Sequence, residues 1–223
     1  DEVIVGTTAG QKSEVRVFSN SGVLRAKFSP YSDAVGATIA VCDLNSDGQQ
    51  EIVTVPGKGT RPLVRIFSGT GKATLTPSRF FALDKKFTGG ARLACADFNA
   101  DGKAEIAVTG EQGSDGAIVV YSSGGVQTAK FFPFSASFRG GLTLTTGLFS
   151  SNQTPALLVG SLSGKTKVGV FTAQGNAVLR PFFPYGKNYA GGVSVASGDL
   201  NTDGVSDIVV APIGKTKPVV KTF

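Results

Sequence analysis

Short apolar runs recur along the chain at a nearly constant interval. Five of them begin at residues 2, 51, 105, 155 and 207, so the spacings are 49, 54, 50 and 52 residues. Each run is about five residues long and rich in Val, Ile and Leu, which is typical of a buried β-strand. The chain is therefore built from repeats of about fifty residues. The runs are 2–6, 51–55, 105–109, 155–160 and 207–211.

Three further runs accompany each of these central strands. One ends in an aromatic residue and is followed, in the first four repeats, by a short Gly-bearing turn of the kind that closes a hairpin. The next run closes on an aromatic cluster, and the last is rich in small and β-branched residues. These aromatic-ended runs are 15–18, 64–67, 118–121, 168–171 and 219–223; the aromatic clusters are 28–31, 80–83, 131–134 and 182–185; the small-residue runs are 37–41, 91–95, 142–146 and 193–197.

Four strands per repeat at a period near fifty are typical of a β-propeller blade. We label the small-residue strand A, innermost in the blade, and the central, aromatic-ended and aromatic-cluster strands B, C and D. We therefore predict an all-β protein, a β-propeller of four-stranded antiparallel blades with about 4.5 repeats in one domain or segment, 1–223. The predicted repeat units are 1–36, 37–89, 90–140, 141–191 and 192–223.

The predicted strands do not fill whole blades. The first unit lacks an A strand and the last lacks a D strand, which leaves eighteen strands in all. Further repeats outside this sequence would explain this, and so would a second chain that supplies the missing strands, because open strand edges readily pair. The chain also contains no Met, so we expect it to be a processed or excised piece of a longer product.

The composition excludes much of enzyme chemistry. The chain has no His, no Trp and two Cys, so a Ser-His-Asp triad, a Cys-His dyad and a four-thiolate zinc site cannot form within it. Cys42 and Cys95 lie on neighbouring A strands but differ by one residue in register, so we expect opposite-facing side chains and free thiols. No apolar run reaches the roughly 18 residues of a membrane-spanning helix, and we expect no membrane insertion.

Three loops between strands A and B carry the pattern D-x-N-x-D-G-x-x-[DE]. Oxygen ligands at positions 1, 3 and 5 converge on one point, Gly at position 6 permits a sharp turn, and position 9 adds a carboxylate. Position 7 adds a backbone carbonyl. The pattern predicts about three bound Ca²⁺ ions, which prefer such oxygen ligands, rather than zinc. The predicted ligands are Asp43, Asn45, Asp47, Gln49 and Glu51; Asp97, Asn99, Asp101, Lys103 and Glu105; and Asp199, Asn201, Asp203, Val205 and Asp207.

Two other interpretations of these loops are possible, and both fit the pattern less well. Asp, Asn and Gly also make good turns without any metal, but three copies at the same place in the repeat favour a metal site. A helical calcium-binding hand needs a carboxylate at position 12 between two helices, whereas the ninth residue here opens a strand. The fourth loop, 148–156, has no acidic residue, so we predict no ion there.

The small-residue strand, the D-x-N-x-D-G-x-x-[DE] loop and the apolar strand after it together resemble the FG-GAP (integrin-α-type, VCBS-like) propeller repeat. The resemblance extends over nearly the whole chain. It is greatest to the bacterial surface-protein version, in which an aromatic-Pro-aromatic element and a Gly-Gly pair precede the strand, as in 182–185 and 191–192. The resemblance implies a secreted or surface-displayed, calcium-stabilised propeller used for binding and adhesion.

The formal net charge of +6 is expected to lie on one rim. In an up-and-down blade the A–B and C–D loops share one rim and the B–C and D–A loops share the other. Nine of the 16 acidic residues lie in the three predicted calcium loops, and the opposite rim carries an excess of seven positive charges. Its cations are Lys12, Lys58, Arg61, Lys85, Lys86, Arg139, Lys165, Lys167, Lys187, Lys215 and Lys217, and its acids are Asp33, Asp84, Glu111 and Asp115.

The basic rim predicts an anionic glycan or an acidic protein surface as partner. Phe87, Phe138 and Tyr189 lie in the same D–A loops; they either contribute to binding or fill the gaps between blades. No nucleic-acid-binding motif accompanies the charge, so we expect no nucleic-acid partner. Homo-oligomers through open strand edges are a further expectation.

The sequence thus predicts an extracellular or cell-surface, non-enzymatic, calcium-binding propeller that acts in binding or adhesion. One alternative is a structural subunit of a surface filament or layer. A polysaccharide-processing enzyme is the other alternative, but the carboxylates outside the calcium loops form no suitably spaced catalytic pair. Those carboxylates are the four acids of the basic rim together with Asp1, Glu2 and Glu14.

Overall fold

The computed structural model describes residues 2–8, 10–214 and 217–223 and contains five antiparallel sheets of three, four, four, four and three strands. We number them blades 1 to 5. Blade 1 consists of β1 (Glu2–Gly6), β2 (Val15–Ser19) and β3 (Leu24–Phe28), and blade 2 of β4 (Thr38–Cys42), β5 (Glu51–Val55), β6 (Leu63–Phe67) and β7 (Arg79–Phe81). Blade 3 consists of β8 (Ala91–Ala96), β9 (Glu105–Gly110), β10 (Ile118–Tyr121) and β11 (Gln127–Phe131). Blade 4 consists of β12 (Leu142–Gly147), β13 (Ala156–Ser161), β14 (Val168–Phe171) and β15 (Ala177–Phe182), and blade 5 of β16 (Val193–Gly198), β17 (Asp207–Pro212) and β18 (Lys221–Thr222).

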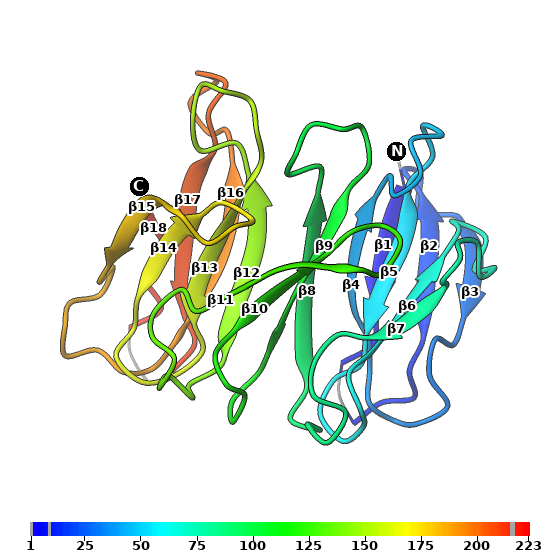
Figure 1. Ribbon diagram of the computed structural model, residues 1–223, viewed down its shortest axis with the longest axis horizontal. Helices are drawn as coiled ribbons and strands as arrows, with labels where there is room; N and C mark the ends of the chain where they lie inside the picture. The colour runs from blue at the N-terminus through cyan, green and yellow to red at the C-terminus, as the bar shows by residue number, and fades with distance from the viewer. Residues whose placement is uncertain (1, 9, 215–216) are drawn as a thin grey trace.

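The blades follow one another in chain order. Figure 1 shows blades 1 and 2 at the right, blade 3 in the middle and blades 4 and 5 at the left. The fold is a five-blade, all-β propeller, so the predicted fold class is confirmed. No helix in the described ranges is long and apolar enough to cross a membrane.

The core lies between the blades because each sheet has two covered faces. Strands β5, β9 and β13 are buried along their whole length, as expected for uninterrupted apolar runs with blades on both sides. Val53 and Ile66 of blade 2, for example, pack in one cluster with Leu93 and Ile106 of blade 3. Burial of such side chains stabilises the fold by about 1.5–3 kcal/mol each.

Aromatic pairs join the outer strands of successive blades. An aromatic ring at or near the end of each D strand contacts the ring that ends the aromatic-ended run of the next blade. The ring centroids lie 4.7 to 6.0 Å apart. Glycine in the next blade's C–D turn leaves room for the ring, because a Cβ at Gly71 would lie 2.5 Å from Phe28. The pairs are Phe28–Phe67, Phe80–Tyr121, Phe131–Phe171 and Phe182–Phe223.

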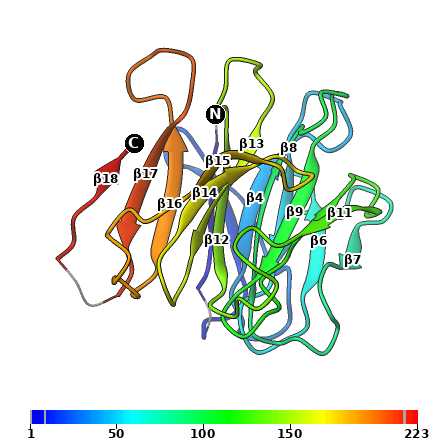
Figure 2. The same cartoon turned by 60° about the vertical axis from the view of Figure 1, so that its left-hand side comes forward.

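The two incomplete blades leave strand edges open among the described residues. In blade 1 the inner strand β1 pairs only with β2, and in blade 5 the outer strand β18 pairs only with β17. Figure 2 shows β18 at the margin of the molecule. The final strand is also shorter than the predicted run 219–223. The edges lie where the sequence places the missing A and D strands.

The expectation of free thiols is wrong, because Cys42 and Cys95 form a disulfide with a Cα–Cα distance of 6.1 Å. Cys42 ends β4 and Cys95 lies in β8. Strand register relates side chains within one sheet, whereas β4 and β8 belong to different blades. In a propeller, the facing surfaces of neighbouring blades pack together, so side chains that point to opposite pleat faces of their own sheets meet in the interface. The one-residue difference in register therefore points both cysteine side chains into the interface between blades 2 and 3, where they bond.

Candidate metal loops

The three predicted calcium loops fold into the same tight turn. In loop 97–105 the backbone is left-handed at Ala100 (φ 60°) and Gly102 (φ 86°). The carboxylate of Asp97, at position 1, accepts the N–H groups of Asp101 at 3.2 Å and Gly102 at 2.8 Å. The first aspartate therefore organises the turn from within. The corresponding left-handed residues of the other loops are Ser46, Gly48, Thr202 and Gly204.

In two loops the side chains at positions 3, 5 and 9 meet. In loop 43–51 the Asn45 Nδ2 donates to Asp47 Oδ2 at 3.0 Å and to Glu51 Oε1 at 3.4 Å. In loop 97–105 the equivalent distances are 3.1 and 2.9 Å. The carboxylates at positions 5 and 9 therefore meet at the Asn Nδ2, whereas the Asn Oδ1 that the sequence assigns to the ion accepts the position-5 N–H at 2.8 Å in both loops.

The glutamate at position 9 is the buried member of each set. Glu51 and Glu105 are 3% and 7% exposed, and their second carboxylate oxygens accept the N–H groups of Leu44 and Phe98 at 2.9 and 3.0 Å. Burial raises the pKa of both carboxyls, and the loop aspartates raise it further. At Asp43, burial also acts upward, but N–H groups of its own loop outweigh it and lower the pKa.

Loop 199–207 has the same turn but a more open setting. Asp207 Oδ2 accepts the Leu200 N–H at 2.8 Å, as in the other loops. Leu200, at position 2, is 62% exposed, whereas Leu44 and Phe98 are 1% and 6% exposed. The difference arises because the position-2 side chain packs against the following blade, and blade 5 has none among the described residues. This loop is therefore the least supported of the three.

Loop 148–156 of blade 4 keeps a turn without acidic residues. Asn152 Oδ1 accepts the hydroxyl of Ser150 at 2.6 Å and the N–H of Thr154 at 3.1 Å. The left-handed residue is Gln153 (φ 57°), at position 6, where the other loops have glycine. The loop thus folds by side-chain amide and hydroxyl bonds and offers no carboxylate to a cation.

The loops also contact one another across blade boundaries. The N–H at position 8 of one loop donates to the position-1 carbonyl of the preceding loop, from Ala104 to Asp43 at 2.8 Å and from Ser206 to Leu148 at 2.6 Å. Pro155 occupies position 8 in blade 4 and has no N–H to donate. These bonds were not foreseen from the sequence, since position 8 shows no residue preference apart from this proline.

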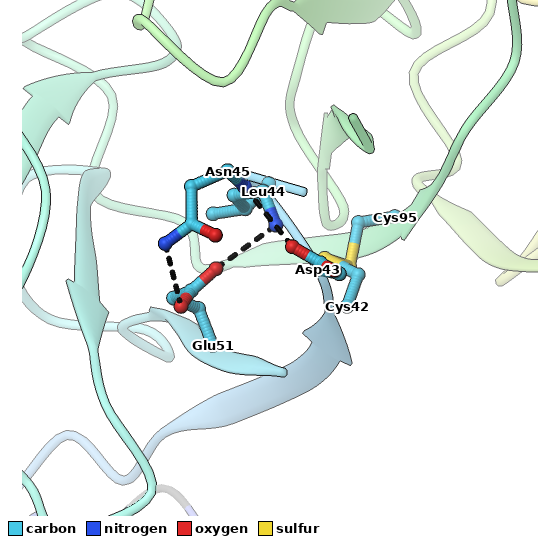
Figure 3. Close-up of a disulfide and its surroundings, with 6 residues drawn as sticks. All are labelled: Cys42, Asp43, Leu44, Asn45, Glu51 and Cys95. Carbon is cyan, nitrogen blue, oxygen red and sulfur yellow. Dashed lines mark hydrogen bonds between the residues drawn. A yellow bond between two sulfur atoms is a disulfide. The ribbon is translucent and has the colours of Figure 1, made fainter. Parts of the chain in front are cut away.

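Figure 3 shows how close the disulfide lies to the first loop. Cys42 directly precedes Asp43, and Cys95 precedes Asp97 by two residues. The cross-link therefore ties the start of the first loop to the start of the second, and the Ala104–Asp43 hydrogen bond ties it to the end of the second.

The donor chemistry of the three loops fits calcium. Among the described residues no three Asp, Glu or Cys side chains form a metal cluster by themselves, so a site here depends on the Asn side chains and the position-7 carbonyls as well. Carboxylate, amide and carbonyl oxygens are the ligands that calcium takes. When bound, the ion would neutralise the like charges that the loop brings together; the loop residues would hold it.

The cations of the predicted basic rim are largely exposed, and several contact the protein's own groups. Arg61 and Lys85 both lie over the ring of Phe81, at 5.4 and 5.1 Å from its centroid. Arg139 donates to the Ala136 and Phe138 carbonyls. Lys215 lies outside the described residues.

The three aromatic residues of this rim are half-buried. Their rings cover the first glycine of each Gly-Gly pair: a Cβ at Gly89, Gly140 or Gly191 would lie 2.3 to 2.6 Å from the ring. Of the two interpretations given above, the packing role is therefore seen in the structure. The rings are Phe87, Phe138 and Tyr189.

Three acidic residues outside the loops form ion pairs. Glu14 lies 2.6 Å from Arg16 and 2.8 Å from Lys27. Asp115 pairs with Lys130 at 2.8 Å, and a further pair joins Glu111 to Arg92 at 3.0 Å. Asp1 lies outside the described residues. Glu14, Glu111 and Asp115 therefore act as ion-pair partners.

Comparison with known proteins agrees with the repeat analysis. Residues 43–108, which span two candidate loops, match the family described as FG-GAP-like repeat. These residues belong to the FG-GAP-like repeat family. The resemblance recognised in the sequence is thereby confirmed for the repeat family, while the bacterial surface-protein version stays a prediction. No curated protein is significantly similar to the chain.

Solved structures are similar in fold only. A rhamnogalacturonan lyase from Bacillus licheniformis is 16% identical with a TM-score of 0.55; the match covers 91% of this chain and 48% of the lyase, so the chain spans about half its length. A protein of unknown function from Bacteroides caccae is 13% identical with a TM-score of 0.56, covering 100% of this chain and 72% of that one. The biofilm matrix protein Bap1 of V. cholerae is 15% identical, covering 100% and 48%, but its TM-score of 0.40 is too low to support an argument.

Proposed function

We propose that the chain is an extracellular, calcium-stabilised FG-GAP-type propeller that acts as a binding or adhesion module rather than as an enzyme. One observation carries the calcium part: three loops at the same place in successive repeats share the ligand spacing and the same Asp-organised turn, whereas the loop without acids is built differently. Each ion is expected to bind in the ~10⁻⁴ to 10⁻³ M range of extracellular modules.

The disulfide supports the extracellular part of this proposal. Disulfides persist in oxidising compartments and are rare in the cytosol of most organisms. The binding part is supported by the exposed basic rim and by the rhamnogalacturonan lyase, a solved structure that shares only the fold. An acidic protein surface is the other candidate ligand. The open edges of β1 and β18 could pair with another chain, and they support the second candidate function, a filament or layer subunit.

Thermal unfolding with and without chelator tests the calcium part. We expect EDTA to lower Tm and added calcium, but not sodium at equal ionic strength, to restore it. At calcium concentrations tenfold above Kd the three sites together contribute about 4 kcal/mol. A Tm that is indifferent to chelator would contradict the proposal. Native mass spectrometry of the purified chain then separates a monomeric module from a self-associating subunit.

A further inference from the structure

Each blade ends in a position that fills the interface with the next blade. In each of blades 1 to 4, one phenylalanine of the D strand pairs with the first residue of the aromatic-ended run of the same blade. This pairing aligns the four blades at Phe28, Phe80, Phe131 and Phe182. Three residues further on, the four blades carry Tyr31, Leu83, Phe134 and Tyr185. Among these four blades, blade 2 alone has no aromatic ring at this position.

The rings at this position fill space between blades. Tyr31 is 8% exposed, and its hydroxyl bonds to Thr54 Oγ1 at 3.0 Å and to the Leu63 carbonyl at 2.8 Å, both in blade 2. Tyr185 donates to the Val210 carbonyl of blade 5 at 2.8 Å. Phe134 packs edge-on against Phe138, with centroids 5.7 Å apart.

Blade 2 leaves this space partly open. Ala82 and Leu83 stand where the other blades have proline and an aromatic residue. A cleft of about 640 Å³ lies here between blades 2 and 3, with Leu83, Val119 and Tyr121 contributing apolar surface. The Tyr121 hydroxyl of blade 3 donates to the Ala82 carbonyl of blade 2 at 2.8 Å. Tyr121 therefore joins the two blades and forms part of the cleft wall. Its volume is within the range of small-ligand sites.

The walls of the cleft are polar and electrically balanced. Lys86 and Asp84 come from the D–A segment of blade 2, and Gln127 and the Lys130–Asp115 ion pair come from blade 3. Asp84 uses one carboxylate oxygen to accept the Lys86 N–H. Ammonium, carboxylate and amide groups therefore surround an apolar surface, and two positive charges match two negative ones.

We propose that this cleft is a saccharide-binding site. A sugar ring has hydroxyls around its edge, which donate to carboxylates and accept from ammonium and amide groups, and C–H faces that pack on apolar side chains. The cleft supplies both kinds of contact, and it opens among the D–A and B–C segments that form the basic rim. The inference rests on the proposed binding function and assigns it to one blade interface.

The repeat itself supplies the test variant. Leu83→Phe places at this interface the residue that blade 3 carries as Phe134, so it fills the cleft with a side chain that the fold accommodates elsewhere. Lys86→Gln and Gln127→Ala remove polar contacts without adding volume. Lys72→Ala, in the C–D connection of blade 2, removes a comparable exposed charge on the opposite rim and is the matched control.

The probes are gluco-oligosaccharides and oligogalacturonides, which represent neutral and acidic saccharides, measured by isothermal titration calorimetry with folding checked by circular dichroism. We expect at least one class to bind the native chain, Leu83→Phe and Lys86→Gln to weaken binding about tenfold or more, and Lys72→Ala to leave it unchanged. A preference for oligogalacturonides would identify Lys86 as a carboxylate partner; equal binding would identify a hydroxyl partner.

Two results overturn the inference in different ways. If saccharides bind and folded Leu83→Phe and Lys86→Gln bind equally well, the cleft is not the site, although the glycan-binding proposal stands. If neither probe binds the native chain at millimolar concentration, the glycan-binding proposal fails together with the cleft. Should Leu83→Phe not fold, the Lys86→Gln and Gln127→Ala titrations decide.

Discussion

Blades 2 and 3 are joined at their inner strands by a disulfide, whereas blades 4 and 5 are joined at the same place by hydrogen bonds. Gly147 and Ser197 occupy the positions of Cys42 and Cys95 in the repeat. The Ser197 hydroxyl donates to the Thr146 carbonyl at 2.5 Å, and a Cβ at Gly147 would lie only 3.0 Å from the Ser197 Cβ. The same junction is therefore closed by two different chemistries.

The loops next to these junctions differ in parallel. The loops of blades 2 and 3 hold six acidic side chains at the predicted ligand positions, and loop 148–156 of blade 4 holds none. Yet both kinds of loop connect strands A and B in the same register and receive an inter-blade N–H bond at position 1. The fold of the junction does not require the acids, and the proposed cation binding would give their repetition a role.

Among the variants that test this comparison, removing the disulfide should lower the free energy of unfolding the most. Cys42→Ala with Cys95→Ala opens a cross-link between residues 53 apart in sequence, which stabilises the fold by about 4 kcal/mol in the chain-entropy account. We expect a loss of about that size in urea unfolding. Ser197→Ala at the equivalent junction should cost about 1 kcal/mol. Equal losses from the two variants would show that the junctions are not distinguished by the cross-link.

The second largest effect should come from removing an acidic residue of the loops. Asp97→Ala deprives the Asp101 and Gly102 N–H groups of their charged acceptor and should cost about 2–3 kcal/mol, with a smaller response of Tm to chelator than in the native chain. Asn152→Ala in blade 4 is the matched control. It should cost about 1 kcal/mol and leave the chelator response intact. A reduced chelator response in Asn152→Ala would mean that blade 4 also holds an ion.

The inter-blade hydrogen bond at Ser206 should give the smallest effect. Its hydroxyl accepts the Leu148 N–H at 3.0 Å, so Ser206→Ala should destabilise the junction of blades 4 and 5 by about 1 kcal/mol. Ser151→Ala, on the exposed part of the neighbouring loop, should change the free energy of unfolding by less than about 0.5 kcal/mol. Hydrogen exchange at the Leu148 amide checks the location, because faster exchange is expected only in Ser206→Ala.

The strand order was predictable because it depends on local patterns. Uninterrupted apolar runs, Gly-bearing turns and a fifty-residue period are all present in the sequence, and β1, β5, β10 and β14 lie where those patterns place them. Strand ends were less predictable: Lys221–Thr222 is a fragment of the predicted run, since Val219 and Val220 have no described D strand to pair with and are 48% and 61% exposed.

Contacts between blades could not be predicted in the same way. Strand register favours free thiols over the disulfide, because it describes neighbours within a sheet and not faces packed across an interface. The cleft at Leu83 depends on one missing ring, whose absence is visible only after the register has aligned the four blades. The ligand positions of the loops, by contrast, follow from spacing alone, since positions 1 to 9 lie within one tight turn.

Anomalous diffraction from crystals grown with calcium tests the central claim most directly. The account predicts three anomalous peaks, each surrounded by the oxygens of positions 1, 3, 5, 7 and 9 in loops 43–51, 97–105 and 199–207, and no peak at loop 148–156. The peak at 199–207 should be the weakest because its position-2 side chain is exposed. Three loops without peaks at millimolar calcium would contradict the account.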